Sequence, residues 1–256
     1  MEKIQELQKA QVIYVTSPER AINYKWEKDS KKINSQVRII SEDDLSNLQE
    51  SGYIHFPQKP IIGDVLVKHP FEPCTYIHAE NAIETIRQSK FFKICEIAQL
   101  LGTVKYQTDA IWKKSETRKV EANGEINYEV VVDSEIKIDS KEKMAQVSKL
   151  TINADFNGIQ VISKESFLKA QNKAKEYGLW GDVSIISLIN QRDPENQNRL
   201  KELKYHIDLT SEANHLLDIA FSLEVAAIFN LKATIKSAIS KQENMTIDVT
   251  FVFPDE

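Results

Sequence analysis

The sequence predicts an α+β fold, in which a twisted antiparallel sheet with a long hairpin meander packs against a long C-terminal helix. Three observations predict it. Residues 125–139 alternate between apolar and polar side chains, which is the period of a strand with one buried face. Several strand patterns follow one another without intervening helices, unlike the βα rhythm of a parallel sheet. Residues 211–241 form a helical pattern that is apolar nearly all round, which is typical of a central buried helix.

The N-terminal third contains short elements. Residues 1–10 have the spacing of a short helix, Val12–Val15 has the composition of a strand, and residues 16–36 are polar and are expected to be irregular. Ser41, with an acidic residue three places on, is typical of a helix N-cap, and the helix that it begins is expected to end at Gly52.

The segment after this helix is expected to form edge strands or loops. Tyr53–Phe56 and Ile61–Lys68 have strand composition, but four of the seven prolines lie between Pro57 and Pro73. Proline cannot donate to a sheet ladder and is therefore confined to edges and bulges.

The remaining chain carries the predicted core. Residues 79–101 have one apolar face at helical spacing and are followed by Gly102, so a helix is expected there; the face consists of Ile83, Ile86, Lys90, Ile94, Ala98 and Leu101. Helices capped by Ser163 and Asp182 are expected to end near Tyr177 and Gln191. Strands are expected at Thr103–Trp112, Thr117–Ala122, Glu125–Asp139, Met144–Phe156, Leu203–Leu209 and Met245–Phe253.

We expect one domain over residues 1–256. Within it, residues 1–78 can form an N-terminal lobe, and residues 79–256 form the core of sheet and helices. The size is within the range of one large domain or two small ones.

The turn Asn123-Gly124 predicts a long amphipathic hairpin, because both central residues of a two-residue hairpin turn need positive φ. Such a hairpin either lines a core or inserts into a membrane, where strands need about ten alternating residues. The candidates for interaction or membrane contact are Ile126, Tyr128, Val130 and Val132 on the hairpin, with Trp180, Phe221 and Phe229 elsewhere.

Composition and charge exclude several classes of protein. The chain is 41% hydrophobic and 28% charged, which favours a folded core over disorder, and its net charge of −5 argues against a nucleic-acid partner. Its two cysteines are too few for a disulfide scaffold and fit a reducing cytoplasm. The N-terminus has no apolar segment of the kind found in signal peptides. The seven glycines form no phosphate-binding loop, so we expect no cofactor and identify no small-molecule substrate.

A metal site is one candidate. His69, Cys74 and His78 lie within ten residues and are of the types that bind zinc. Their spacing matches no familiar zinc motif, and incidental loop residues are the alternative interpretation.

An acid–base site is the other candidate. His206 and Asp208 share one face of a predicted strand, and His215 follows at the start of the long helix. These side chains form a His–carboxylate set if the strand and helix fold back on each other. A solvated polar face is the alternative, and no serine or cysteine lies in a nucleophile elbow.

The C-terminal half contains the segments GLWGD at 178–182 and LINQR at 188–192, then NRLKELKYHIDLTSEAN at 198–214, and ends in a strand with Val252-Phe253-Pro254. Over residues 115–254 this pattern resembles uncharacterised bacterial proteins, some of which accompany effector or phage-defence systems. No activity or site residue follows from the resemblance. The combination of sheet, extendable hairpin and packed helices also resembles gasdermin-type pore formers at the level of the fold.

The function expected from these observations is that of a non-enzymatic bacterial effector or adaptor. It would self-associate or bind a protein partner through a sheet edge or an apolar helix, with phage defence as a setting. The alternatives are a pore former that meets a membrane after activation, a hydrolase that uses His206, Asp208 and His215, and a sensor with a small-ligand pocket.

Overall fold

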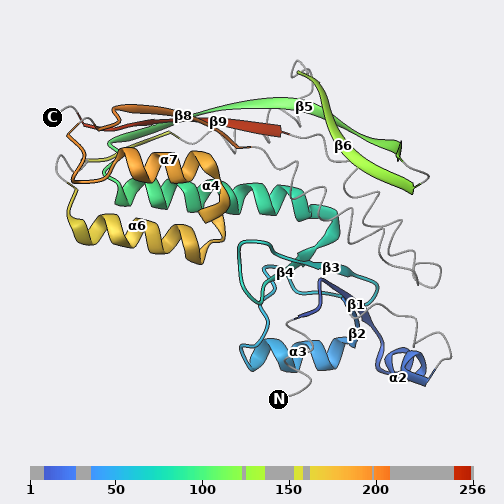
Figure 1. The fold of residues 1–256 in the computed structure, drawn as a ribbon. Coiled ribbons are helices and arrows are strands. Elements are labelled where there is room, and N and C mark those ends of the chain that lie inside the picture. The colour runs from blue at the N-terminus through green and yellow to red at the C-terminus, as the bar shows by residue number, and fades with distance from the viewer. Residues whose placement is uncertain are drawn as a thin grey trace. The chain divides into compact units, whose positions relative to one another are not determined.

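The computed structural model describes residues 9–26, 36–122, 125–135, 153–157, 162–197, 199–207 and 245–254. Within them the protein is mixed α and β, with two antiparallel-rich sheets and five α-helices (Figure 1). The strands are β1 Val12–Thr16, β2 Val37–Ser41, β3 Val65–Lys68, β4 Tyr76–His78, β5 Lys105–Ala122, β6 Glu125–Glu135, β7 Ala154–Asp155, β8 Glu202–Ile207 and β9 Met245–Val252. The helices are α2 Pro18–Trp26, α3 Glu42–Glu50, α4 Ala82–Leu100, α6 Lys164–Glu176 and α7 Val183–Gln191, with short 3₁₀ turns η2 Ala79–Asn81 and η3 Leu179–Gly181.

The chain divides into two compact units. The described residues of the first unit come from residues 1–86 and 116–131, and those of the second come from residues 87–115, 132–209 and 243–256.

The first unit contains a four-stranded sheet in the order β2-β1-β3-β4. Strands β1 and β2 are parallel, with Val12 opposite Val37, and α2 lies between them in the sequence. Strand β3 is antiparallel to both β1 and β4. The prediction of a single antiparallel sheet was therefore wrong in detail, because a parallel β-α-β unit occupies the N-terminal region.

The irregular segment predicted at residues 16–36 was also wrong in part, because α2 begins within it. Its start carries ordinary helix signals. The Ser17 hydroxyl accepts a hydrogen bond from the Arg20 N–H at 3.4 Å, Pro18 is the first helical residue, and Glu19 lies in the first turn. The polar composition of the segment concealed these signals.

Helix α3 confirms the predicted cap and stop. The Ser41 hydroxyl accepts a hydrogen bond from the Asp44 N–H at 3.2 Å. At the other end Gly52 has φ of 71°, its N–H donates to the Gln49 carbonyl, and the next N–H donates to the Leu48 carbonyl. These two hydrogen bonds form the Schellman motif, which needs a residue that tolerates positive φ.

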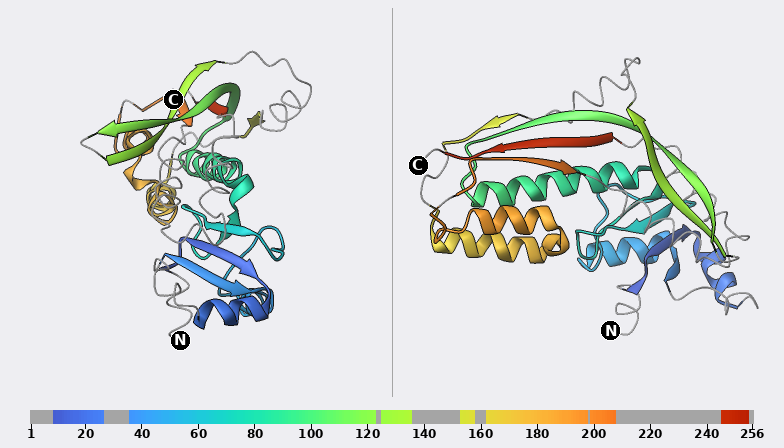
Figure 2. Two further views of the ribbon diagram at one scale, coloured as in Figure 1. Left: turned by 90° about the vertical axis from the view of Figure 1, so that its right-hand side faces the viewer. Right: turned by 45° about the horizontal axis from the view of Figure 1, so that its top comes forward.

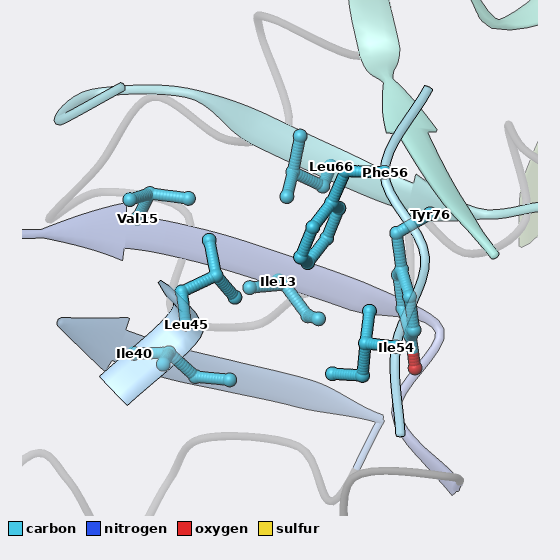
Figure 3. Packing of buried hydrophobic residues seen from close by; sticks show 8 residues of the cluster. All are labelled: Ile13, Val15, Ile40, Leu45, Ile54, Phe56, Leu66 and Tyr76. Atoms are coloured by element: carbon cyan, nitrogen blue, oxygen red, sulfur yellow. The ribbon is translucent and has the colours of Figure 1, made fainter. Parts of the chain in front are cut away.

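The core of the first unit lies between its sheet and α3 (Figure 3). The predicted strand at Tyr53–Phe56 makes only one isolated bridge, from His55 to Thr75. Its alternation still holds, because Ile54 and Phe56 are buried and His55 is exposed. The cluster consists of Ile13, Val15, Ile40, Leu45, Ile54, Phe56, Leu66 and Tyr76.

The second predicted strand of this region begins later than expected. Residues 61–64 form a tight turn, in which the Asp64 N–H donates to the Ile61 carbonyl and the Asp64 carboxylate accepts from the Ile61 N–H at 2.7 Å. Strand β3 therefore starts at Val65.

The second sheet has the order β6-β5-β9-β8, with β7 paired to β5. Strands β7, β8 and β9 belong to the second unit, whereas residues 116–131, which include the end of β5 and most of β6, are grouped with the first. Figure 2 shows β9 lying between β5 and β8, with α4 and α7 against one side of the sheet. On β8 and β9 the side chains alternate strictly. Those facing the helices are buried, namely Tyr205, Ile207, Ile247, Val249 and Phe251.

Strand β5 is continuous, whereas the sequence predicts two strands separated near residues 113–116. That stretch, Lys-Lys-Ser-Glu, contains serine, which favours turns only weakly, and none of glycine, proline, asparagine or aspartate. Its polar composition alone did not interrupt the strand.

The three predicted helices of this region are confirmed. The apolar face of α4 is buried, and even Lys90 is only 8% exposed. The Ser163 hydroxyl caps α6 through the Ser166 N–H at 3.1 Å, and the Asp182 carboxylate caps α7 through the N–H groups of Ser184 and Ile185. Among the described residues, no helix combines the length and apolar character needed to cross a bilayer.

Several predictions lie outside the described residues. They concern the helix at residues 1–8, the turn Asn123-Gly124, the strand residues 144–152 and the long helix at residues 211–241.

Candidate functional site: the outer face and edge of β8

His206 and Asp248 form a cross-strand pair on the outer face of the second sheet. They are directly opposite in the register of β8 and β9, and His206 Nδ1 lies 2.5 Å from Asp248 Oδ1. Their side chains are 46% and 42% exposed. The pair therefore faces solvent, with the carboxylate fixing one nitrogen of the imidazole.

Tyr205 occupies the opposite face of the same strand. Because side chains alternate along a strand, it points toward the helices and is only 4% exposed. Its hydroxyl donates to Asp182 Oδ2 at 2.5 Å, while Oδ1 of the same carboxylate caps α7. One carboxylate thus joins the start of α7 to the middle of β8.

The backbone of β8 is paired on one side only within the described part of the chain, because β8 is the last strand of its sheet. The Phe253 N–H donates to the Lys201 carbonyl at 2.8 Å, which makes these opposed residues a hydrogen-bonded pair. Bonded and non-bonded pairs alternate in an antiparallel ladder. The N–H and C=O groups of Glu202, Lys204 and His206 therefore point away from β9, and their side chains are exposed.

This open edge ends at Leu200. The Leu200 N–H donates to the Gln191 carbonyl at 3.2 Å, and Arg192 Nη1 donates to the Leu200 carbonyl at 3.0 Å. Both outward backbone groups of that residue are thus engaged by the C-terminal end of α7. The part of the edge that remains accessible begins at Glu202.

Arg192, at the C-terminal end of α7, contacts Leu101, Leu200 and Phe253. It is 1% exposed, its Nε donates to the Leu101 carbonyl at 3.2 Å, and its guanidinium lies 4.6 Å from the ring centre of Phe253. The ring attracts the cation through its π electrons. The carbonyl at the C-terminal end of α4 carries partial negative charge, which also attracts a cation. This role of Arg192 was not predicted from the sequence.

A second polar cluster joins α4 to α6. The Tyr177 hydroxyl donates a short hydrogen bond to Glu96, and Lys93 and Lys173 lie 4.5 and 5.0 Å from the centre of the Tyr177 ring. Burial, followed by the hydrogen bond to Glu96, raises the pKa of Tyr177. The paired charges make this a helix–helix contact.

The structure places only one of the three predicted acid–base residues, His206, because Asp208 and His215 lie outside the described residues. The sequence analysis missed its partner, Asp248. Both residues occupy polar positions of strands that were predicted to alternate, but the register that brings them together cannot be obtained from alternation alone.

The predicted metal ligands have other contacts. His69 is buried and its Nδ1 accepts from the Phe71 N–H at 3.1 Å, whereas His78 Nδ1 lies 3.4 Å from Asp64 Oδ2. Cys74 is half-buried. Within the described ranges, no group of three or more His, Cys, Asp or Glu side chains is arranged to hold a metal ion.

Of the predicted interaction residues, Trp180 lies in η3, where Lys175 Nζ is 4.8 Å from its ring centre. Ile126, Tyr128, Val130 and Val132 belong to β6, of which only the backbone is described, and Phe221 and Phe229 lie outside the described residues.

The buried Cys95 is not an activated nucleophile. Burial raises the pKa of the Cys95 thiol to about 12, so the thiol remains protonated at neutral pH. Cys74 and Cys95 are both free thiols.

Comparison with known proteins gives no match to a family model, to a curated protein or to a solved structure.

Proposed function

We propose that this protein acts by associating with other protein chains through the open edge of β8. The observation that carries the proposal is the outward set of backbone groups at Glu202, Lys204 and His206, which is a template for an added strand. The exposed charges beside these groups can select a partner strand by sign.

The cellular role proposed is that of a bacterial effector or adaptor, with phage defence as its setting. It is supported by the resemblance of residues 178–214 and of the final strand to bacterial proteins that accompany such systems. The two free thiols support action in a reducing cytoplasm.

Photo-crosslinking in living bacteria tests association at the edge. A benzoyl-phenylalanine at position 204 is expected to give covalent adducts with protein on irradiation, because its side chain stands beside the open backbone. The matched control is the same residue at position 169, because Lys169 is 62% exposed and lies on helix α6 rather than on a strand. Equal labelling at both positions, or none at position 204 in a folded chain, would contradict the proposal.

A hydrolase is the second candidate, because the His206–Asp248 pair has the geometry of a base held by a carboxylate. Hydrolysis of a series of nitrophenyl esters by the wild-type chain, lost at least about tenfold in Asp248→Asn, is the expected result if this pair is catalytic. Activity that does not depend on Asp248 would dismiss it.

A pore former is the third candidate. Strands β5 and β6 contain 18 and 11 residues, and a tilted strand needs about 9–11 residues to cross a bilayer. Dye release from anionic liposomes, before and after limited proteolysis, tests this activity. Complete retention of dye in both conditions would exclude it.

A further inference from the structure

We propose that the partner at the edge of β8 is a second copy of this chain, and that the two β8 strands pair antiparallel about a two-fold axis at Lys204. This inference rests on the proposed function, since it identifies the partner of the same edge. It makes the five-stranded sheet that contains β8 continuous across two molecules.

The accessible length of the edge sets the register. Among the described residues of β8, the outward backbone groups are those of Glu202, Lys204 and His206, whereas those of Leu200 are already bonded to Gln191 and Arg192. A window from 202 to 206 is symmetric about residue 204. When it pairs with itself, Glu202 faces the second copy's His206 and Lys204 faces Lys204, and about six hydrogen bonds form.

Neighbouring registers are less favourable. A shift of two residues in one direction brings His206 opposite the second copy's Leu200, where the end of α7 already occupies the edge. The opposite shift places Lys204 opposite the second copy's His206 and so loses the contact between Glu202 and His206. A shift of one residue would place an outer-face side chain of one copy opposite an inner-face side chain of the other. The helices of the two copies would then lie on opposite faces of the joined sheet.

The charges along β8 suit this self-pairing. An antiparallel arrangement brings the first residue of one copy beside the last residue of the other, so the acidic Glu202 meets His206 at both ends. Across three strands this produces the row Asp248, His206 and the second copy's Glu202, in which an imidazole lies between two carboxylates.

Lys204 on the axis gives selectivity. Two facing lysines repel each other, and lysine on an edge strand commonly prevents indiscriminate pairing. In this register, however, each lysine also has the second copy's Glu202 as its diagonal neighbour, about 7–8 Å away and within reach of its long side chain. A different partner strand that has no acidic residue at the position of Glu202 would lack the attraction to Lys204 and would experience only its positive charge.

On the inner face, Leu203 and the second copy's Tyr205 become close neighbours. They form non-hydrogen-bonded pairs, whose side chains approach more closely than those of bonded pairs. Leu203 is half-buried in the single chain, so pairing removes additional apolar surface from water.

Oxidative cross-linking tests the axis directly. In Lys204→Cys the two thiols face each other with Cα atoms about 5.5 Å apart, within the range of a disulfide, so a covalent dimer is expected under mild oxidation. Glu202→Cys alone should not cross-link, since its two copies are about 13 Å apart along the strands, but it should cross-link when mixed with His206→Cys. The control is the unmodified chain, which already contains Cys74 and Cys95.

Charge reversal tests the energetics by sedimentation velocity. The contact is short, so we expect a dissociation constant on the order of micromolar. Glu202→Lys should weaken the dimer about tenfold, because two symmetry-related pairs are lost, and Lys204→Thr should strengthen it. Glu165→Lys on α6, at a site that is 77% exposed, should leave it unchanged, and circular dichroism verifies that each variant is folded.

The outcomes distinguish this inference from the proposed function. A dimer cross-linked through position 204, weakened by Glu202→Lys, supports both. Adducts at position 204 only with other proteins, and no cross-link in Lys204→Cys, overturn self-pairing and leave association at the edge standing. No adduct of any kind overturns both.

Discussion

The Tyr205 hydroxyl donates a hydrogen bond to the Asp182 carboxylate across 2.5 Å, and this contact fastens the second sheet to the first turn of α7. A hydrogen bond to a charged group is stronger than one between neutral groups. Because the same carboxylate also caps the helix, its loss should affect both elements.

We therefore expect Tyr205→Phe to lower the free energy of unfolding by about 1.5–3 kcal/mol, because the half-buried carboxylate loses a hydrogen-bond donor. Urea denaturation followed by circular dichroism measures it. Tyr53→Phe is the matched control, since Tyr53 is 46% exposed and should change stability by less than about 0.5 kcal/mol. Equal effects of the two substitutions would show that the Tyr205 contact contributes nothing.

Arg192 should tolerate no replacement, including lysine. It reaches two carbonyls and the Phe253 ring at once from a site that is 1% exposed, and an ammonium group cannot reproduce the planar arrangement of its donors. We expect Arg192→Lys to cost about 1.5–3 kcal/mol, the range for losing a hydrogen bond between a charged group and a carbonyl. Arg20→Lys on the exposed face of α2 is the control, and thermal unfolding compares the two. A difference of less than about 1 kcal/mol would contradict the role assigned to Arg192.

Cys74 is the only non-glycine residue with positive φ in the described part of the chain, at 59°. This conformation costs a residue with a side chain about 1 kcal/mol, and a β-branched residue more. Cys74→Gly should therefore match or exceed the wild type in stability, while Cys74→Val should lose more than about 1 kcal/mol. Chemical denaturation of the two variants in parallel decides the matter, because similar values would mean that the backbone is not strained at this position.

Alkaline pH should destabilise the fold partly through Cys95. Burial raises the pKa of its thiol from 9.0 to about 12, so between these values the unfolded chain releases a proton that the folded chain retains. The contribution of this thiol to the free energy of unfolding is fully present below about pH 9. It decreases by up to about 1.4 kcal/mol per pH unit as the pH rises toward 12. Burial raises the pKa of Tyr76 and Tyr106 as well and acts in the same direction.

The contribution of Cys95 is isolated by comparing the wild type with Cys95→Ala between pH 8 and pH 11. The variant is expected to be less stable at pH 8, because a cavity replaces the thiol, but to show a flatter decline. Parallel declines would contradict the assignment. In the native wild type, an aromatic disulfide reagent should react quickly with Cys74 and slowly with the buried Cys95.

Local features of the fold were predictable where one short segment contains both the hydrogen-bond donor and its acceptor. The caps at Ser41, Ser163 and Asp182 are of this kind, since each donor lies two or three residues from its acceptor. The buried face of α4 was also predictable, because its spacing alone defines it. Helix α2 was missed because its polar composition outweighed a correct Ser-Pro-Glu start.

The candidate site was predictable only in part. Alternation placed His206 on the polar face of a strand, but Asp248 is 42 residues away and only the strand register makes them partners. The position of β8 at the edge of its sheet, and the closure of that edge at Leu200 by Arg192, depend equally on contacts between distant segments. Such contacts leave no periodic signal in the sequence.

The pairing of β5 with β9 has a consequence for how the chain folds during synthesis. The Thr103 hydroxyl donates to the Val252 carbonyl 149 residues later, and Lys105 lies opposite the same residue. The four-stranded sheet joins strands that lie between residues 12 and 78, so it can assemble early in synthesis. Strand β5, in contrast, cannot pair with β9 until β9 has emerged from the ribosome. At about 5–20 residues per second this delay lasts many seconds, during which the backbone edge of β5 that pairs with β9 has no native partner, so we expect the nascent chain to be a client for chaperones.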